Sequence, residues 1–259
     1  MPTPPLMQAS ETGVAAVERA LLLLDAFTHE RSRLTLHELA EHTGLYKSTI
    51  LRLLASLMRR ECIVRLEDGS YAPGPVLLRW GSAYLSSVRV DTHITPVLAQ
   101  LVQQTGESAT FYVRQQDVRV CLARVDSAHS VRDHVHVGDV LPLDRGAGGK
   151  VLLAFEADGG ARRARAASSM VFSSFRERDA DGAAIAAPVF GPGGTLKGAI
   201  SLSGSVARFS DAALPRYSRA LLTAAAEATR RMGGDASVFE ENSARAARST
   251  TRRKALVGD

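Results

Sequence analysis

The chain has 259 residues, of which 45% are hydrophobic and 23% charged, an ordinary globular composition. Such a composition argues against a chain that is disordered throughout or built from low-complexity repeats. Its apolar runs are far shorter than the roughly 18 residues of a membrane span, and its start lacks the basic and apolar segments of a secretory signal. Its two cysteines fit neither a disulfide framework nor a CxxC zinc site. The sequence therefore predicts a cytoplasmic protein with no membrane partner.

The net charge of +5 suggests a nucleic-acid partner, but the distribution of that charge along the chain weakens the argument. Residues 1–89 hold 10 Lys/Arg and 9 Asp/Glu, and residues 90–242 hold 17 of each. The excess lies in residues 243–259, which hold five Lys/Arg and one acid and few apolar side chains. We expect a basic, disordered tail over 236–259 and a disordered start over 1–13.

Three predicted helices are followed by a hairpin in the first 75 residues. Apolar spacing predicts a helix over 14–29, and the T-x-x-E pattern of Thr35 and Glu38 predicts a capping box at the start of the second. Gly44 ends that helix, and a third is predicted over 46–60. Two short strands with an Asp-Gly turn between them then predict a hairpin. Three helices and a hairpin are typical of a winged helix-turn-helix, which we place at 14–74.

The rest of the chain reads as an α+β domain joined through a linker helix. Pro73-Gly74-Pro75 marks the boundary, a linker helix is predicted over 75–90, and helical patterns recur over 94–105, 149–156 and 211–232. Two hairpins are predicted, 108–125 and 183–203. Antiparallel hairpins with flanking helices favour an α+β fold over 91–235 rather than a doubly wound sheet.

The third helix carries the strongest functional signal. An α-helix fits the major groove of DNA, and its outward side here is polar or cationic. Arg52 is the best candidate for a base contact, because its guanidinium matches the acceptors of guanine. Arg65, with Ser70, would touch the backbone from the hairpin. The other candidates, expected at the groove or at phosphates, are Lys47, Ser48, Thr49, Arg59 and Arg60. An ordinary solvated helix face, or a winged helix that contacts protein, is the alternative.

These residues resemble a known family. Five segments look like those of IclR-type bacterial transcription regulators, and they follow the family order over 14–232. They are VxxVERALxLLDAF from Val14, LAxxTGLxKSTxxRLL from Leu39, TGE from Thr105, GKxLLA from Gly149 and APVF from Ala187. The resemblance implies a winged-helix reader joined by a helix to a GAF-like effector-binding domain. It also implies a homodimer or a dimer of dimers bound to a double-stranded operator.

A glycine-rich segment, Asp144 to Lys150, is the first candidate for a ligand site. It is not a phosphate loop, because the first glycine of GxxxxGK[ST] would fall at Asp144 and Val151 replaces the hydroxyl. The amides at a helix start can instead attract an anion such as a carboxylate, with Arg145 as a bidentate partner. Close helix–sheet packing is the alternative reason for these glycines.

The resemblance also implies further effector contacts. It places them at Ala147 and Gly148 in this loop, at Ser201 and Ser203 on a strand, and near Ser174 and Glu177. Ala184 stands where many members carry a pocket cysteine, Tyr46 replaces a usual proline, and the stretch between Lys150 and Glu177 is short for the family. The change at Tyr46 bears on the local approach to DNA, and the other two departures leave the identity of the effector open.

We therefore expect a DNA-binding transcriptional regulator whose affinity for its operator is modulated by a small-molecule effector, an organic acid, with repression and activation both open. We expect no catalytic residues, no cofactor and no metal; His134 and His136 lack a third ligand. Two alternatives stay open at this point. One is a GAF-like enzyme with an accessory winged helix, and the other is a winged-helix module for protein contacts.

Overall fold

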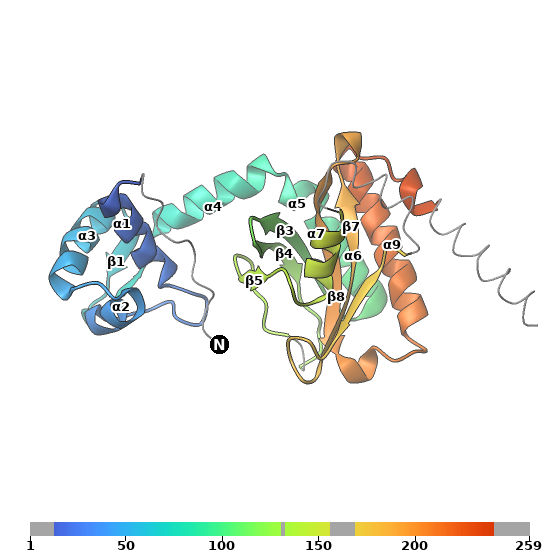
Figure 1. The fold of residues 1–259 in the computed structure, drawn as a ribbon, viewed down its shortest axis with the longest axis horizontal. Coiled ribbons are helices and arrows are strands. Elements are labelled where there is room, and N and C mark those ends of the chain that lie inside the picture. The colour runs from blue at the N-terminus through green and yellow to red at the C-terminus, as the bar shows by residue number, and fades with distance from the viewer. Residues whose placement is uncertain (1–12, 131–132, 156–168, 241–259) are drawn as a thin grey trace, which may run out of the picture. The chain divides into compact units, whose positions relative to one another are not determined.

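The computed structural model describes residues 13–130, 133–155 and 169–240. The chain divides into two units, residues 1–88 and 89–259 (Figure 1). No helix among the described residues is long and apolar enough to cross a membrane. The predicted disordered start lies, apart from Gly13, outside the described residues.

The first unit is a winged helix-turn-helix, as expected. Its hairpin is antiparallel, with Ile63 opposite Pro73 and Arg65 opposite Tyr71. Its elements are α1 (Ala15–Asp25), α2 (Leu36–Thr43), α3 (Lys47–Arg59), β1 (Ile63–Arg65), β2 (Tyr71–Pro73) and α4 (Pro75–Ser87).

One apolar cluster holds α1, α2, α3 and the hairpin together. Ile50 and Leu54, one turn apart on α3, are fully buried against Leu23 of α1 and Leu39 of α2. Because the inward stripe of α3 is used for this core, its polar stripe must face outward.

Local capping sets the helix boundaries. Thr35 and Glu38 form the predicted capping box, with the Thr35 amide donating to Glu38 Oε2 at 2.7 Å. Gly44 has a φ of 68°, which ends α2 in the left-handed conformation and permits the tight break before α3. The first helix ends at Asp25 rather than at residue 29, because Thr28 and Arg31 exchange backbone hydrogen bonds in a turn.

The linker helix is shorter than predicted. α4 begins at Pro75, where proline is tolerated, and ends at Ser87. Arg89 then has a positive φ of 53°, so the predicted continuation to residue 90 is wrong. A separate four-residue turn of helix, α5 (Val90–His93), follows.

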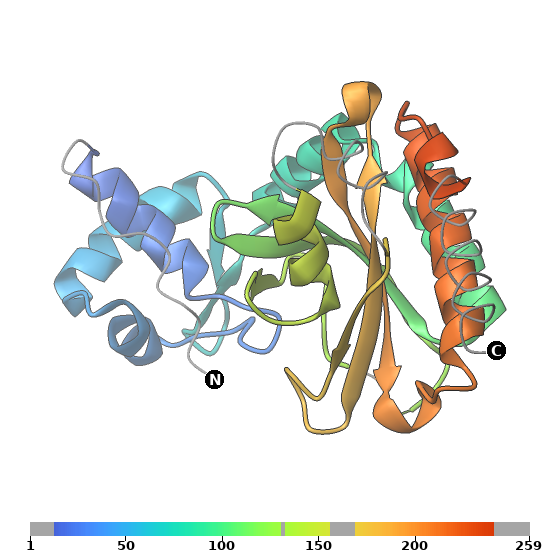
Figure 2. The ribbon, with the colours of Figure 1, turned by 45° about the vertical axis from the view of Figure 1, so that its right-hand side comes forward.

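The second unit is built on one antiparallel sheet with strand order β5-β4-β3-β8-β7-β6. Figure 2 shows α7 (Ala147–Phe155) over one face and the pair α6 (Thr95–Thr105) and α9 (Leu214–Arg231) over the other. The strands are β3 (Ser108–Gln115), β4 (Val118–Val125), β5 (Val140–Pro142), β6 (Phe172–Phe175), β7 (Gly182–Phe190) and β8 (Leu196–Ser205).

The chain beyond α9 corrects one expectation. Residues 236–240 were expected to start a disordered tail, but residues 237–240 are helical and Val238 and Phe239 are buried. The ring of Phe239 packs on Phe190, with centroids 6.3 Å apart. Burial of this apolar pair explains the difference, since such side chains leave water when a partner surface is available. The remaining predicted tail, 241–259, lies outside the described residues.

Candidate DNA-binding surface and ligand pocket

The outward side of α3 presents the predicted DNA contacts to solvent. Ser48 and Arg52 are exposed and Thr49 is half-buried, while Ile50 and Leu54 close the opposite side. Lys47, Arg59, Arg60 and Arg65 are also exposed. Among the described residues, none of these five cations forms an ion pair with a carboxylate, so their charge is available to an outside anion.

The start of α3 is equally open. Tyr46, at the N-cap, is 84% exposed and forms no side-chain cap, and the first turn holds no acid. Unsatisfied amides and the positive end of the helix dipole suit a phosphate there.

Of the two hairpin residues expected to contact the DNA backbone, Arg65 is exposed and Ser70 is not. The Arg65 guanidinium lies over the Tyr71 ring, 5.9 Å from its centroid, and remains exposed. Ser70, by contrast, is buried and donates its hydroxyl to Asp68 Oδ1 at 2.5 Å. Its expected contact with the DNA backbone is therefore wrong: the hydroxyl is used to close the turn.

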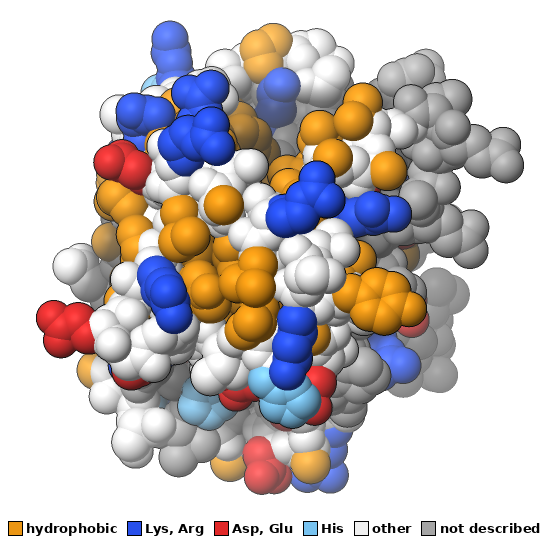
Figure 3. Space-filling view, turned by 90° about the vertical axis from the view of Figure 1, so that its left-hand side faces the viewer, with side chains coloured by type: hydrophobic (Ala, Val, Ile, Leu, Met, Phe, Trp, Pro, Cys, Tyr) orange, Lys and Arg blue, Asp and Glu red, His pale blue; other side chains and the backbone are white. Residues whose placement is uncertain are grey.

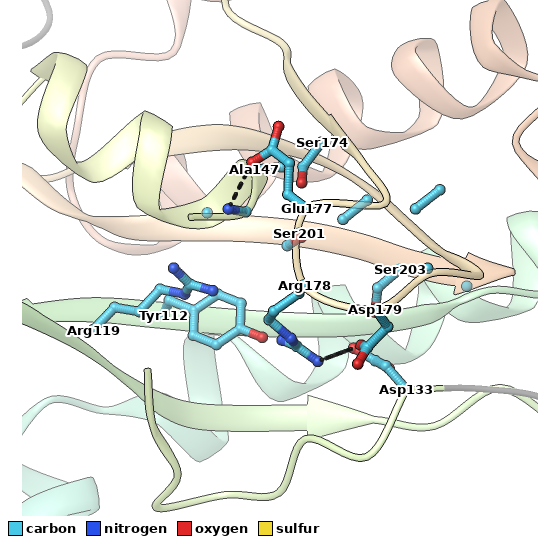
Figure 4. A pocket seen from close by; sticks show the side chains of 16 residues that line it. Tyr112, Arg119, Asp133, Ala147, Ser174, Glu177, Arg178, Asp179, Ser201 and Ser203 are labelled. Atoms are coloured by element: carbon cyan, nitrogen blue, oxygen red, sulfur yellow. Dashed lines mark hydrogen bonds and ion pairs between the residues drawn. The ribbon is translucent and has the colours of Figure 1, made fainter. Parts of the chain in front are cut away.

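In the second unit, a pocket lies between the start of α7, the sheet and the β6–β7 loop (Figure 4). Seven of the eight predicted effector contacts line it: Ala147, Gly148, Ser174, Glu177, Ala184, Ser201 and Ser203. Arg145 does not line it. Its side chain points into solvent, with Nε 3.9 Å from Asp144 Oδ2. The sequence pattern does not give the orientation of this side chain, so the expected contact could not be checked before the structure.

The anion position at the start of α7 is filled by a side chain of the protein itself. The Gly146 amide donates to Glu177 Oε2 at 3.1 Å, and Lys150 Nζ donates to Glu177 Oε1 (Figure 4 marks the first contact). The hydrogen bond from Lys150 is the main cause that lowers the pKa of Glu177. The expected attraction of this helix start for a carboxylate is thus satisfied internally.

Arg119 of β4 is a pocket residue that the sequence interpretation missed. It is 2% exposed, and its Nη1 donates to the carbonyls of Pro142 and Arg145. The guanidinium lies over the Tyr112 ring, 5.2 Å from its centroid, and its buried Nε has no hydrogen-bond partner among the described residues. Burial lowers the pKa of Arg119, yet arginine stays charged at any physiological pH.

Two glycines of α7 make this arrangement possible. A Cβ at Gly149 would lie 2.2 Å from the Leu143 carbonyl oxygen and 2.7 Å from Arg119 Nη1. A Cβ at Gly148 would lie 2.9 Å from the ring of Tyr112. Close packing, the alternative reason for the glycine-rich segment, therefore accounts for both positions.

The far wall of the pocket is an ion-pair network. Asp133 accepts a hydrogen bond from Arg124 Nη2 at 2.7 Å and lies 3.7 Å from Arg178, which is also 3.5 Å from Asp179. The hydroxyl of Ser201 donates to the Ile185 carbonyl, whereas the buried Ser203 Oγ has no partner among the described residues.

The described residues hold no cluster of three or more His, Cys, Asp or Glu side chains placed to bind a metal. Cys121 is fully buried in β4, and burial raises the pKa of its thiol to about 12, so it is a poor nucleophile at neutral pH.

Comparison with known families decides the class of protein. The IclR helix-turn-helix domain matches residues 16–67, and the bacterial transcriptional regulator IclR C-terminal domain matches residues 82–171 and 172–230. The chain belongs to the IclR family of bacterial transcriptional regulators. The resemblance drawn from its sequence is confirmed.

Individual relatives support the same class for this IclR-family chain. The HTH-type transcriptional regulator KipR of Bacillus subtilis is 25% identical over 242 residues, covering 84% of this chain and 96% of that protein. BhcR of Paracoccus denitrificans, also an HTH-type transcriptional regulator, is 28% identical and covers 83% and 86%. These relatives are named regulators rather than enzymes, so the chain is a DNA-binding transcriptional regulator and the enzyme alternative falls.

Solved structures share the fold of this IclR-family chain. A putative IclR transcriptional regulator from Silicibacter sp. TM1040 superposes with a TM-score of 0.71 at 24% identity, covering 85% of this chain and 97% of that one. An IclR homologue from Microbacterium hydrocarbonoxydans, complexed with 4-hydroxybenzoate, has a TM-score of 0.70 at 17% identity and covers 84% and 99%.

Proposed function

We propose that this protein acts in the cytoplasm as a one-component regulator, in which the winged helix binds a specific operator and a small carboxylate in the second unit modulates that binding. The observation that carries the effector half is the pocket, which holds a buried arginine and a serine hydroxyl. Within the described part of the chain, the arginine has no carboxylate partner and the serine hydroxyl has no hydrogen bond. A buried cation of this kind is costly unless an anion pairs with it.

The operator half is supported by α3. Its exposed face offers Ser48, Arg52 and Lys47 to a groove while Ile50 and Leu54 fix the helix from behind. Arg52 would read a base, and Lys47, Arg59, Arg60 and Arg65 would neutralise phosphates.

For the ligand, Arg119 would pair with the carboxylate in place of Arg145. Ala147, Gly148 and Ala184 would form the apolar wall, and Ser201 and Ser203 the polar one. The bound 4-hydroxybenzoate of the Microbacterium homologue is itself a carboxylate, which favours this class of ligand.

We also propose a homodimer, or a pair of dimers. Apolar side chains gather between Lys and Arg side chains on the face in Figure 3. In the first unit, α1 and α4 leave five large apolar side chains half or more exposed: Val17, Leu21, Leu78, Trp80 and Tyr84. Such exposure suits a second copy of the chain, whose winged helix would reach the other half of a palindromic operator. The ligand then acts by binding one arrangement of the dimer more tightly than another.

Fluorescence anisotropy with the full chain tests both halves. Labelled duplexes from the DNA beside its own gene are compared with shuffled duplexes at about 150 mM salt, with and without a panel of carboxylates that includes 4-hydroxybenzoate. We expect binding to one native duplex roughly 10³-fold tighter than to shuffled DNA, and a shift of roughly 5-fold or more with one acid. Equal binding to all duplexes would overturn the operator half of the proposal. If no carboxylate of the panel changed DNA binding, the effector half would be overturned.

A further inference from the structure

The pocket contains one cation, Arg119, that forms no ion pair with a described carboxylate. No described carboxylate lies within 4 Å of Arg119, and its hydrogen bonds go to neutral carbonyls. Asp144 attracts Arg119 from beyond ion-pair distance, but it is solvent-exposed and lies 3.9 Å from Arg145. The other arginine of the pocket, Arg178, has two acids within 3.7 Å. The pocket therefore has room for one negative charge at Arg119.

A second anion position exists at the mouth, and the protein occupies it. The donors there are the Gly146 amide and Lys150 Nζ, and both point at the Glu177 carboxylate. Lys150 is fixed further by a 2.9 Å hydrogen bond to the Ser173 carbonyl. The side chain of Glu177 is still 32% exposed, so a bound molecule reaching the mouth would meet its charge.

The space between the two positions is small, and its remaining charged residues are paired with one another. The cavity is about 50 Å³, which suits a small molecule. Ser203, which is 8% exposed and has no described partner, offers a neutral hydroxyl. Tyr112 and three alanines add neutral surface, while the charged residues of the far wall, Asp133, Arg178 and Asp179, pair with one another. A hydrogen-bonding or apolar group fits here better than a second charge.

We propose that the pocket selects a small monocarboxylate, which pairs with Arg119, and that Glu177 excludes dicarboxylates by holding the second anion position. The inference rests on the proposed function, because it specifies the ligand of the same pocket. Figure 4 shows the two parts: the Glu177 carboxylate is turned toward the start of α7, and Arg119 lies with Tyr112 at another side. A second carboxylate would be repelled by Glu177 and would find its donors taken.

Size-matched pairs of acids isolate the effect of charge. Oxamate and oxalate, malonamate and malonate, and succinamate and succinate each differ by one carboxylate replaced with an amide of the same shape. Binding to the full chain is measured by isothermal titration calorimetry at pH 7.5 and constant ionic strength. We expect at least one monocarboxylate to bind, and to bind about tenfold or more tightly than its dicarboxylate partner.

Glu177→Gln should bring that ratio close to one by admitting the dicarboxylate, while affinity for the monocarboxylate stays within about threefold. Glu227→Gln, which removes a carboxylate from α9 paired with Arg230 and Arg231, should leave the ratio unchanged. Arg119→Gln, checked for folding by circular dichroism, should lose both members of the pair.

The outcomes separate this inference from the proposed function. Equal binding of both members to the unmodified protein, or a ratio that Glu177→Gln does not change, overturns the selection by Glu177. Failure of every small acid to bind overturns the small-monocarboxylate ligand, whereas the response of DNA binding to the wider carboxylate panel decides the proposed function itself.

Discussion

Glu107 and Arg208, 101 residues apart, form a bidentate ion pair in the second unit, with Nε–Oε1 at 2.7 Å and Nη2–Oε2 at 2.9 Å. Glu107 is 1% exposed, and Tyr217 of α9 donates its hydroxyl to the same carboxylate at 3.2 Å. The pair thus joins the start of β3 to the end of β8 and to α9, and it lies outside the ligand pocket.

Replacing Arg208 with Met should therefore destabilise the second unit by about 3 kcal/mol, because it leaves a buried carboxylate without its cation. Urea denaturation followed by circular dichroism measures the change. Arg231→Met provides the control: its partner Glu227 is only partly buried and keeps its pair with Arg230, and the loss should be below about 0.5 kcal/mol. Similar losses in the two variants would contradict a structural role for the buried pair.

Gly149→Ala should be destabilising by about 2 kcal/mol, since the added Cβ would overlap the Leu143 carbonyl and press on Arg119. Gly81→Ala is the matched control, because Gly81 lies within α4 and a Cβ there meets no atom within 4 Å. That change should stabilise the chain by about 1 kcal/mol through helix propensity alone. Thermal unfolding distinguishes the two signs, and a stabilising Gly149→Ala would show that α7 does not pack as described.

The winged helix could be predicted from the sequence because its signals are local. The capping box at Thr35, the left-handed Gly44 and the Asp-Gly turn each act over a few residues, and the apolar stripe of Ile50 and Leu54 lies on one helix. Such signals are complete within a short window. The edge strands β5 and β6 were missed, since three or four residues are too few to show an alternating pattern.

The ligand pocket could be predicted only in part. The residues carried over from the family resemblance line it, but Arg145, expected as the bidentate partner of a carboxylate, does not, whereas Arg119 does. The surroundings of Arg119 include Pro142 and Tyr112, which lie on the strands β5 and β3 on either side of β4. These neighbours are far from Arg119 in sequence or depend on strand pairing, so no local pattern shows them. One local signal was available: Arg119 shares a strand face with the buried Cys121, and a charged residue on a buried face calls for a partner.

Arg52 and Arg60 should differ in what they contribute to DNA binding. Arg52→Ala should cost about 1–3 kcal/mol on the operator and less on shuffled DNA, because a base contact is lost. Arg60→Ala should weaken binding to both and lower the salt slope by about one. Arg219→Ala, an equal loss of charge on α9, is the control and should change neither. Anisotropy titrations at several salt concentrations measure all three, and equal effects of Arg52→Ala on both duplexes would contradict its assignment to a base.

The stability contributed by Glu177 should depend on pH in a defined direction. Its pKa is lowered from 4.5, chiefly by the hydrogen bond from Lys150, so the folded state favours the charged carboxylate. The contribution is therefore fully present above about pH 4.5 and is lost as the pH falls through the lower folded value. Because both side chains are partly exposed, we expect it to be below about 1 kcal/mol.

Thermal unfolding of the unmodified protein and of Glu177→Gln between pH 3 and 7.5 measures this contribution as the difference between their melting temperatures. The difference should be constant near neutral pH and shrink below about pH 4.5. In a Lys150→Met background the same substitution should produce a smaller and flatter difference, because the main cause of the lowered pKa is gone. A difference that widens on acidification would mean that Glu177 is held in its protonated form, and the hydrogen bonds at the start of α7 would then have to be reassigned.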